Sequence, residues 1–499
     1  MSNTPTNYSR IAICTTSDVD KLYPLLKSYV QHPSSAKTVS EIAIDRYRWS
    51  SRSSFPFFFA PQPPPTKKRE ATDALAKDQI RDEAHVALQE YIRGLALDQD
   101  TTANFINAMD QKQLEVINGD EPDQANRIKF ATAAIALLFS LCENITTLYL
   151  AESLDRTFLF EYMLKTNYAE IKKPGLQKLK HLRFIPGCDS DPRNYTTLEI
   201  LRYMQSVHRL PALETVSMDA MQEYQANSQF FVPRTGNMKK LEMTHCDVSG
   251  DYLVRIIAAP KALQELKLSM GGLWHTDGGS PMVTASEIGK ALAAHKDTLR
   301  VLDVDLDKAI YKRDKRREEQ YDYDTDEKNA MRPRRGQPVT NVDRIASDKA
   351  TSVSLKYISE DARGYGFTIG PFHDFPHLRH LSISILTFFG PWNEYVPPFH
   401  LSTPAPFRLI DALPSSLEYL CIYGYTRGMS PDVDGHIDEF LAKKDEKLPK
   451  LTVVEGIKNC VPSLKDIYGS SDKMKEEDLY QPQRMRTGWV EVSQDEEML

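Results

Sequence analysis

The segment HDFPHLRHL places three histidines and an aspartate close together: His373, Asp374, His377 and His380. Imidazole and carboxylate groups are common zinc ligands, but a site on a helix needs two histidines on one face. Pro376 interrupts a helix here, and His380 falls in a predicted strand. We therefore favour turn and surface histidines over a metal site, and we expect no metal or other cofactor.

The glycine-rich segment GGLWHTDGGSP, residues 271–281, is a candidate phosphate-binding loop. It lacks both the lysine of a phosphate loop and the G-x-G-x-x-G spacing, so we favour a loop role, with ligand contact by Trp274 or His275 as the alternative. The acidic run DYDTDE lacks the glycine and distal glutamate of a calcium loop. With no G-x-S-x-G, H-E-x-x-H or kinase motif, we expect no enzyme.

Composition excludes further classes of protein. The 499 residues are 41% hydrophobic, enough for a sizeable core, and their net charge of -7 disfavours a nucleic-acid or membrane-surface binder. The six cysteines form no C-x-x-C pair, which indicates reduced thiols. With no signal peptide or membrane-spanning segment visible, we expect a cytoplasmic or nuclear protein. The basic stretches PPPTKKRE and KRDKRR are either nuclear-localisation signals or solvated loops.

A recurrent spacing of apolar residues, three positions and then two, predicts the elements of the fold. It occurs in VSEIAI, ITTLYL, LKHLRF, LETVSM, MKKLEM, LQELKL, LRVLDV, LRHLSI and LEYLCI, and again near LTVV. MKKLEMTHCDV continues along the leucine-rich-repeat template, with Cys246 and Val248 at its buried positions. Leu148, Leu182, Val216, Leu241, Leu266 and Leu302 follow one another at intervals of 25 to 36 residues, which are repeat lengths.

Helical patterns lie between these strings, so each predicted repeat is one strand followed by one helix. A single repeat cannot bury its apolar side, whereas stacked repeats share a continuous core. We therefore expect an α/β fold: an irregular leucine-rich-repeat solenoid with a curved parallel sheet on the concave side and helices on the convex side.

The sequence resembles a known family, the fungal leucine-rich-repeat proteins of the F-box class, which are substrate receptors of cullin-based ubiquitin ligases. The resemblance rests on DVDKLYPLLKSYVQHPSSAKTVSEIAID and on CDVSGDYLVRIIAAPKALQELKLSM. It implies a repeat fold and protein partners, with ubiquitin-ligase subunits as one possibility. F-box modules open with Leu-Pro, which occurs here only at Leu210, Leu413 and Leu448, beside repeat strands. We expect the F-box itself to be missing or degenerate.

The predicted organisation has six parts. Residues 1–50 hold an N-terminal helix and the first repeat strand, 51–72 a Pro-rich loop, and 73–305 a helical segment and repeats. Residues 306–365 are a charged, largely disordered insertion, 366–468 the C-terminal repeats, and 469–499 a loose acidic tail.

Function is predicted to depend on the residues between the buried leucines. Period-two alternation directs these side chains to the concave face, where they mix both charges with hydroxyl and aromatic groups. Such a surface suits a protein partner, and we expect a non-enzymatic interaction scaffold, or alternatively an F-box-like substrate receptor. The candidate partner-binding residues are Tyr149, Arg183, Glu242, Glu265, Lys267, Asp303, His380 and Tyr419.

Overall fold

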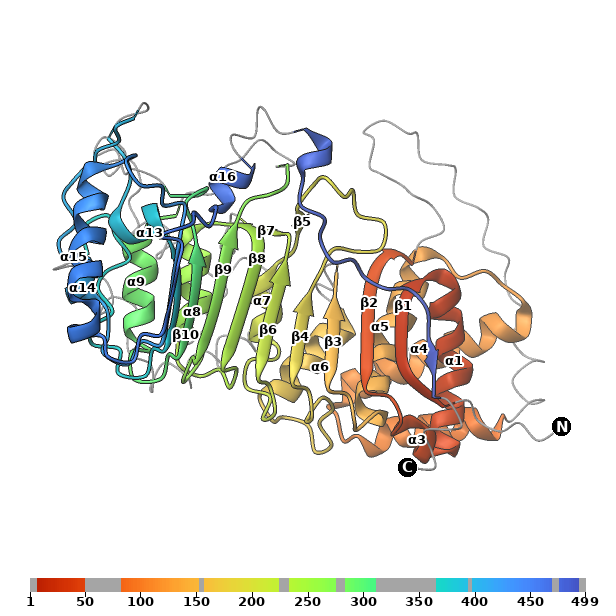
Figure 1. The fold of residues 1–499 in the computed structure, drawn as a ribbon. Helices are drawn as coiled ribbons and strands as arrows, with labels where there is room; N and C mark the ends of the chain where they lie inside the picture. The colour runs from red at the N-terminus through yellow and green to blue at the C-terminus, as the bar shows by residue number, and fades with distance from the viewer. Residues whose placement is uncertain are drawn as a thin grey trace, which may run out of the picture. The chain divides into compact units, whose positions relative to one another are not determined.

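The computed structural model describes residues 7–49, 82–151, 157–223, 233–274, 283–310, 365–393, 397–468 and 475–492. Over these residues the chain is an α/β protein with one large, mostly parallel sheet of 14 strands (Figure 1). The chain divides into two compact units. Unit 1 comprises Met1–Leu179, Gly187–Asp189 and Met485–Leu499, and unit 2 comprises Lys180–Pro186 and Ser190–Arg484. The expected α/β class is confirmed.

Unit 1 combines four strands with long helices. Its elements are β1 (Tyr8–Thr15), α1 (Thr16–Gln31), α2 (Pro33–Ala36), β2 (Glu41–Arg48), α3 (Glu83–Gly94), α4 (Gln99–Asn118), α5 (Gln124–Leu141), β3 (Thr147–Leu150), α6 (Phe158–Asn167) and β14 (Val490–Glu491). The strand order is β3-β2-β1-β14, in which β14 alone is antiparallel to its neighbour. Three helices, α3 to α5, lie between β2 and β3 in the chain, so this unit departs from one helix per strand.

The entry into α1 shows how the sequence sets a boundary. The Thr15 hydroxyl accepts a hydrogen bond from Asp18 N, and the Asp18 carboxylate accepts one from Thr15 N at 3.0 Å. This capping box satisfies amide groups that the first helical turn leaves unpaired. One face of α1, including Val19, Leu22 and Leu26, is then fully buried.

Unit 2 carries the longer part of the sheet. Its strands are β4 (His181–Phe184), β5 (Thr196–Thr197), β6 (Thr215–Asp219), β7 (Met221–Glu223), β8 (Lys240–Val248), β9 (Glu265–Met270), β10 (Val301–Asp305), β11 (His380–Ser384), β12 (Tyr419–Tyr423) and β13 (Val453–Glu455). Its helices are α7 (Ile200–Gln205), α8 (Gly250–Ala258), α9 (Ala285–Ala293), α13 (Ile385–Phe389), α14 (Leu409–Ala412), α15 (Pro431–Lys447) and α16 (Leu464–Tyr468). The main strand order is β13-β12-β11-β10-β9-β8-β6-β4.

The repeated strings supply these strands in register. Leu266 of β9 pairs with Leu241 of β8 on one side and with Leu302 of β10 on the other. The ladder continues through Leu381 to Leu420, and each of these leucines is at most 1% exposed. Nine of the segments with this spacing of apolar residues each contain a strand of the sheet. The predicted core positions of these nine segments are confirmed, whereas in the LTVV segment Val453 is 42% exposed and Val454 is the residue in register with Leu420.

Three features differ from the expectation or lie outside it. The sheet is not curled, and the face expected to be concave is called the open face below. A regular repeat stack bends because each repeat is rotated by the same small amount, and the unequal intervals between these strands do not produce that constant rotation. The Pro-rich loop and residues 311–364 of the insertion lie outside the described residues. Residues 475–492, expected to be loose, form β14 and a 3-10 helix, Glu476–Asp478.

In the part of the chain that the structure describes, no helix has both the length and the apolar character needed to cross a membrane.

Candidate interaction surface

The open face of the sheet in unit 2 is the candidate site. Helices of the unit cover the other face (Figure 1). The open face consists of the side chains that alternate with the buried leucines: Thr215, Ser217, Lys240, Glu242, Glu265, Lys267, Val301, Asp303, His380, Ser382, Tyr419 and Cys421. Nearly all are exposed or half-buried, as the period of two predicts, whereas Cys421 is only 2% exposed.

A charged array occupies the centre of the open face. Register pairs Lys240 with Glu265 and Glu242 with Lys267 on the neighbouring strands β8 and β9. Lys240 Nζ lies 3.6 Å from a Glu265 carboxylate oxygen and 3.8 Å from one of Glu242. These pairs are solvent-exposed and contribute little to stability. Their charges therefore remain accessible to a partner.

Asp303 is the most enclosed carboxylate of the array. It lies beside Lys267 in the register, and its Oδ1 accepts a 3.0 Å hydrogen bond from the Tyr423 hydroxyl. Burial raises the pKa of Asp303, an effect that the bond from Tyr423 opposes. Tyr423 belongs to β12, and its side chain crosses β11 to reach Asp303 on β10. This contact holds an aromatic ring in place on the open face.

The far end of the open face is aromatic. The rings of His380 and Tyr419, paired in register on β11 and β12, stack with centroids 5.9 Å apart. The Tyr419 hydroxyl donates to Glu455 at 2.6 Å. Burial and the neighbouring Glu455 raise the pKa of Tyr419, so it remains a neutral hydrogen-bonding group. Rigid, amphipathic side chains of this kind anchor protein interfaces.

Two further predicted residues lie outside this centre. Arg183 is half-buried on β4, where it pairs in register with Ser217 of β6. Tyr149 belongs to β3 of unit 1, where the Arg10 guanidinium lies 5.2 Å from its ring centroid. The structure thus brings together Glu242, Glu265 and Lys267 with Asp303, and it pairs His380 with Tyr419.

The histidines of HDFPHLRHL do not converge. His373 and His377 are exposed at turns, and His380 is on the open face. Among the described residues, no group of three or more histidine, cysteine or acidic side chains is arranged to hold a metal ion. Trp274 donates its backbone N–H to Arg193 O and lies under the Arg193 guanidinium, which accounts for its position. His275 lies outside the described residues.

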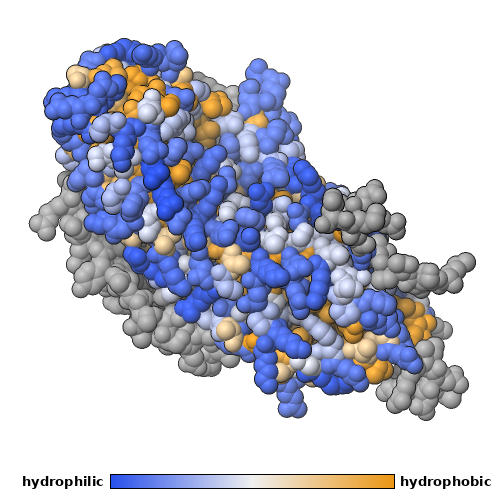
Figure 2. Space-filling model, turned by 60° about the horizontal axis from the view of Figure 1, so that its bottom comes forward, coloured by the Kyte–Doolittle hydropathy of each residue, from blue (hydrophilic) through white to orange (hydrophobic). Residues whose placement is uncertain are grey.

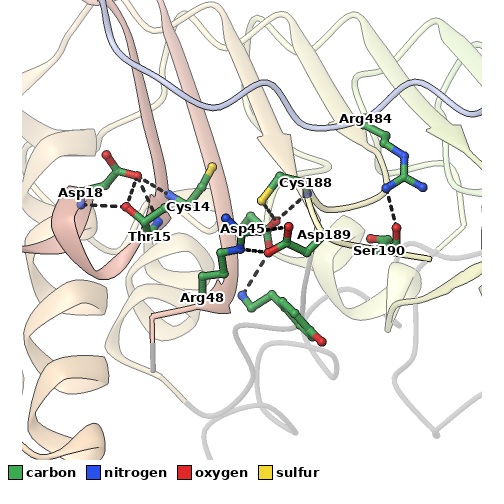
Figure 3. Close-up of polar contacts among 10 residues, drawn as sticks. Cys14, Thr15, Asp18, Asp45, Arg48, Cys188, Asp189, Ser190 and Arg484 are labelled. Carbon is green, nitrogen blue, oxygen red and sulfur yellow. Dashed lines mark hydrogen bonds and ion pairs between the residues drawn. The ribbon is translucent and has the colours of Figure 1, made fainter. Parts of the chain in front are cut away.

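Polar groups lie towards the carboxyl ends of the strands, and the spacing of apolar residues did not predict their contacts. In unit 1, Asp45 in the second half of β2 is 1% exposed and accepts hydrogen bonds from Cys188 N and Cys188 Sγ (Figure 3). Arg48 and Asp189 form an ion pair beside it (Figure 3). Burial and Asp45 raise the pKa of the Cys188 thiol to about 11. The thiol is therefore protonated near neutral pH.

A sequence signal for these groups does exist. In IAID, VSMD and LDVD an aspartate directly follows the last apolar residue of the repeated string: Asp45, Asp219 and Asp305. Each accepts a backbone N–H from a distant segment: Asp45 from Cys188 at 2.9 Å, Asp219 from Gln483 at 3.0 Å, and Asp305 from Leu464 at 2.6 Å. Burial raises the pKa of both Asp219 and Asp305. These aspartates hold loops in place, and a search for acidic residues directly after the repeated apolar strings would have found them.

The surface near the starts of the strands is largely hydrophilic, with smaller hydrophobic patches (Figure 2). The open face, with its charged and aromatic side chains held in register, is therefore the stronger candidate for a binding surface. Comparison with known proteins adds no assignment: no family model, no curated protein and no solved structure matches this chain.

Proposed function

We propose that this chain is a non-enzymatic scaffold that binds a protein partner on the open face of unit 2. The observation that carries the proposal is the in-register array of accessible charges and aromatic rings on β8 to β12. Rigid strands hold these side chains in fixed positions, which favours a specific interface over a merely solvated surface.

The dimensions and charge of the array favour a protein over other ligands. The five neighbouring strands β8 to β12, spaced about 4.8 Å apart, span roughly 19 Å, which is wider than most metabolites. Lysines and carboxylates alternate, so the face has no single sign of charge to attract a phosphate backbone. A partner with a complementary charge pattern and a pocket for Tyr419 would fit it.

We also propose that the strand-and-helix units form a leucine-rich-repeat stack. Support comes from the leucines that share one register from β8 to β12 and from Cys246 and Val248, both 0% exposed at the template positions. The proposed location is the cytoplasm or nucleus, and the proposed partners include neither nucleic acid nor membrane.

Affinity capture with mass spectrometry tests the function. Proteins recovered with the wild-type chain would be compared with those recovered with Lys267→Glu, using Lys443→Glu on α15 as the matched charge-reversal control. We expect specific partners to be lost with Lys267→Glu and retained with Lys443→Glu. Recovery of ubiquitin-ligase scaffold subunits would favour the substrate-receptor alternative, and an unchanged set of all other partners with Lys267→Glu would contradict binding on the open face.

A further inference from the structure

The C-terminal segment of unit 2 lies across the carboxyl ends of its strands. In Figure 1 its 3-10 helix lies beyond the arrowheads of the sheet. Leu479 has an extended backbone conformation, and no regular secondary structure follows it up to Arg484. Here we call Leu479–Arg484 the tail segment. We call the surface beneath it, formed by Tyr195, Asp219, Ala220, His245, Gly272 and Leu273, the tail pocket.

The tail segment occupies this pocket with two adjacent side chains. Leu479 is 5% exposed and packs in a cluster with Tyr195, Ala220 and Leu273. The Tyr480 ring stacks on His245 with centroids 3.4 Å apart and an interplanar angle of 9°. Apolar burial and ring stacking therefore recognise a leucine followed by a tyrosine.

Hydrogen bonds fix the direction of the segment. Tyr480 N donates to Gly272 O at 2.9 Å, and the Tyr480 hydroxyl donates to Asp219 Oδ2 at 3.2 Å. Gln483 N donates to the same oxygen at 3.0 Å. Gly272 permits the close approach, since a Cβ there would lie 3.1 Å from Tyr480 Cβ. The pocket thus binds both the backbone and the side chain of Tyr480, as peptide-binding sites do with their ligands.

His245 has the character of a ligand-binding residue. It has a φ of 49°, an unfavourable conformation for a non-glycine residue, and it lies where the register between β8 and β9 shifts. Its Nδ1 is buried without a hydrogen-bond partner and lies 3.9 Å from Asp219 Oδ1. Backbone strain, a β-bulge and an unsatisfied polar atom together are typical of functional sites rather than of plain packing.

We propose that the tail pocket is a peptide-binding site that the chain's own Leu479–Tyr480 occupies, and that a partner protein presenting an apolar residue followed by tyrosine in an extended segment displaces it. The tethered tail competes at an effective concentration on the order of millimolar. A partner with a hydrogen-bonding group for His245 Nδ1 gains a contact that the tail does not make. The tail is then an internal competitor that selects for strong partners.

Fluorescence anisotropy with a labelled peptide of residues 475–484, KEEDLYQPQR, tests this inference on the full-length chain. The double variant Leu479→Ala/Tyr480→Ala vacates the pocket. We expect it to bind the peptide at least about ten-fold more tightly than the wild type, because the tethered competitor is gone. Adding Asp219→Ala to this variant should weaken binding by about ten-fold or more, and a peptide with alanine at the tyrosine should not bind.

Two controls keep the result interpretable. Glu477→Ala changes an exposed side chain outside the pocket and should bind the peptide like the wild type. Tyr480→Phe removes only the hydroxyl and should expose the pocket partly even if the double variant is unstable. Equal binding of both peptides, or no gain in a vacated variant that melts like the wild type, would overturn the proposal. A wild-type dimer that dissociates on tail mutation would overturn it too, in favour of tail exchange between copies.

Discussion

At the scale of single residues, buried polar groups in this protein mainly hold segments together. His295, 1% exposed, illustrates this role: its Nδ1 accepts a hydrogen bond from Leu263 N at 3.3 Å, and its Nε2 lies 2.8 Å from Ile257 O. Both contacts are satisfied by one neutral tautomer, which donates from Nε2. Burial lowers the pKa of His295 to about 4.

This lowered pKa makes a signed prediction about stability. Between about pH 6.5 and 4 the unfolded chain binds a proton at His295 that the folded chain does not. The contribution of neutral His295 to the free energy of unfolding is therefore fully present above pH 6.5 and is lost as the pH falls towards 4. The stability advantage of the wild type over His295→Gln should shrink by roughly 3 kcal/mol from pH 7 to pH 4. Urea unfolding at both pH values measures it; an unchanged difference would refute a neutral His295. Other titrating groups cancel in the difference.

A second residue-scale prediction concerns the alternation on β9. Leu266 is 1% exposed while its neighbour Lys267 is exposed. Leu266→Ala should reduce the free energy of unfolding by about 2–5 kcal/mol because it leaves a cavity in the core. Lys267→Ala should change it by less than about 0.5 kcal/mol. Chemical denaturation measures both, and similar losses would show that the strand does not have one buried and one open face.

At the scale of elements, the distance between a helix and the neighbouring backbone decides at which glycines a larger residue would destabilise the protein. A Cβ on Gly289 of α9 would lie 1.7 Å from Ile369 O, whereas one on Gly435 of α15 would meet nothing within 4 Å. Both are helical positions, where alanine alone would gain up to about 1 kcal/mol in helix propensity. Only the packing of each helix distinguishes them.

Opposite results are therefore expected for the same substitution. Gly289→Ala should destabilise the protein by about 1–3 kcal/mol, because overpacking against a carbonyl exceeds the propensity gain. Gly435→Ala should stabilise it by up to about 1 kcal/mol. Thermal unfolding of the two variants measures the effects, and a melting temperature that rises in both would show that α9 does not pack on Ile369.

The sequence was informative about elements wherever a repeated pattern existed. Strands with the cadence, such as β9 and β12, could be placed because buried leucines must recur with the period of the fold. β1 and β14 carry no copy of it, and β14 pairs with a strand almost the whole chain away. Such long-range pairing leaves no local signal, which is why the pairing of β14 with β1 could not be predicted.

At the scale of the whole molecule, the sequence predicted which face of the sheet is open but not its detail. Glu242, Glu265 and Lys267 lie together as the alternation requires. Cys421 is buried at an open-face position, and Tyr423 reaches Asp303 from two strands away. These depend on side-chain packing between repeats, which the spacing of residues within one repeat does not determine.

The most direct test of the central proposal is the dissociation constant of a captured partner, measured by isothermal titration calorimetry. The wild-type chain would be compared with Lys267→Glu on the open face and Lys443→Glu on α15. We predict that Lys267→Glu raises the dissociation constant about ten-fold or more, because a reversed charge at an interface centre costs at least about 1.4 kcal/mol, and that Lys443→Glu leaves it within about two-fold. Equal effects of the two substitutions, or none from Lys267→Glu, would contradict binding on the open face.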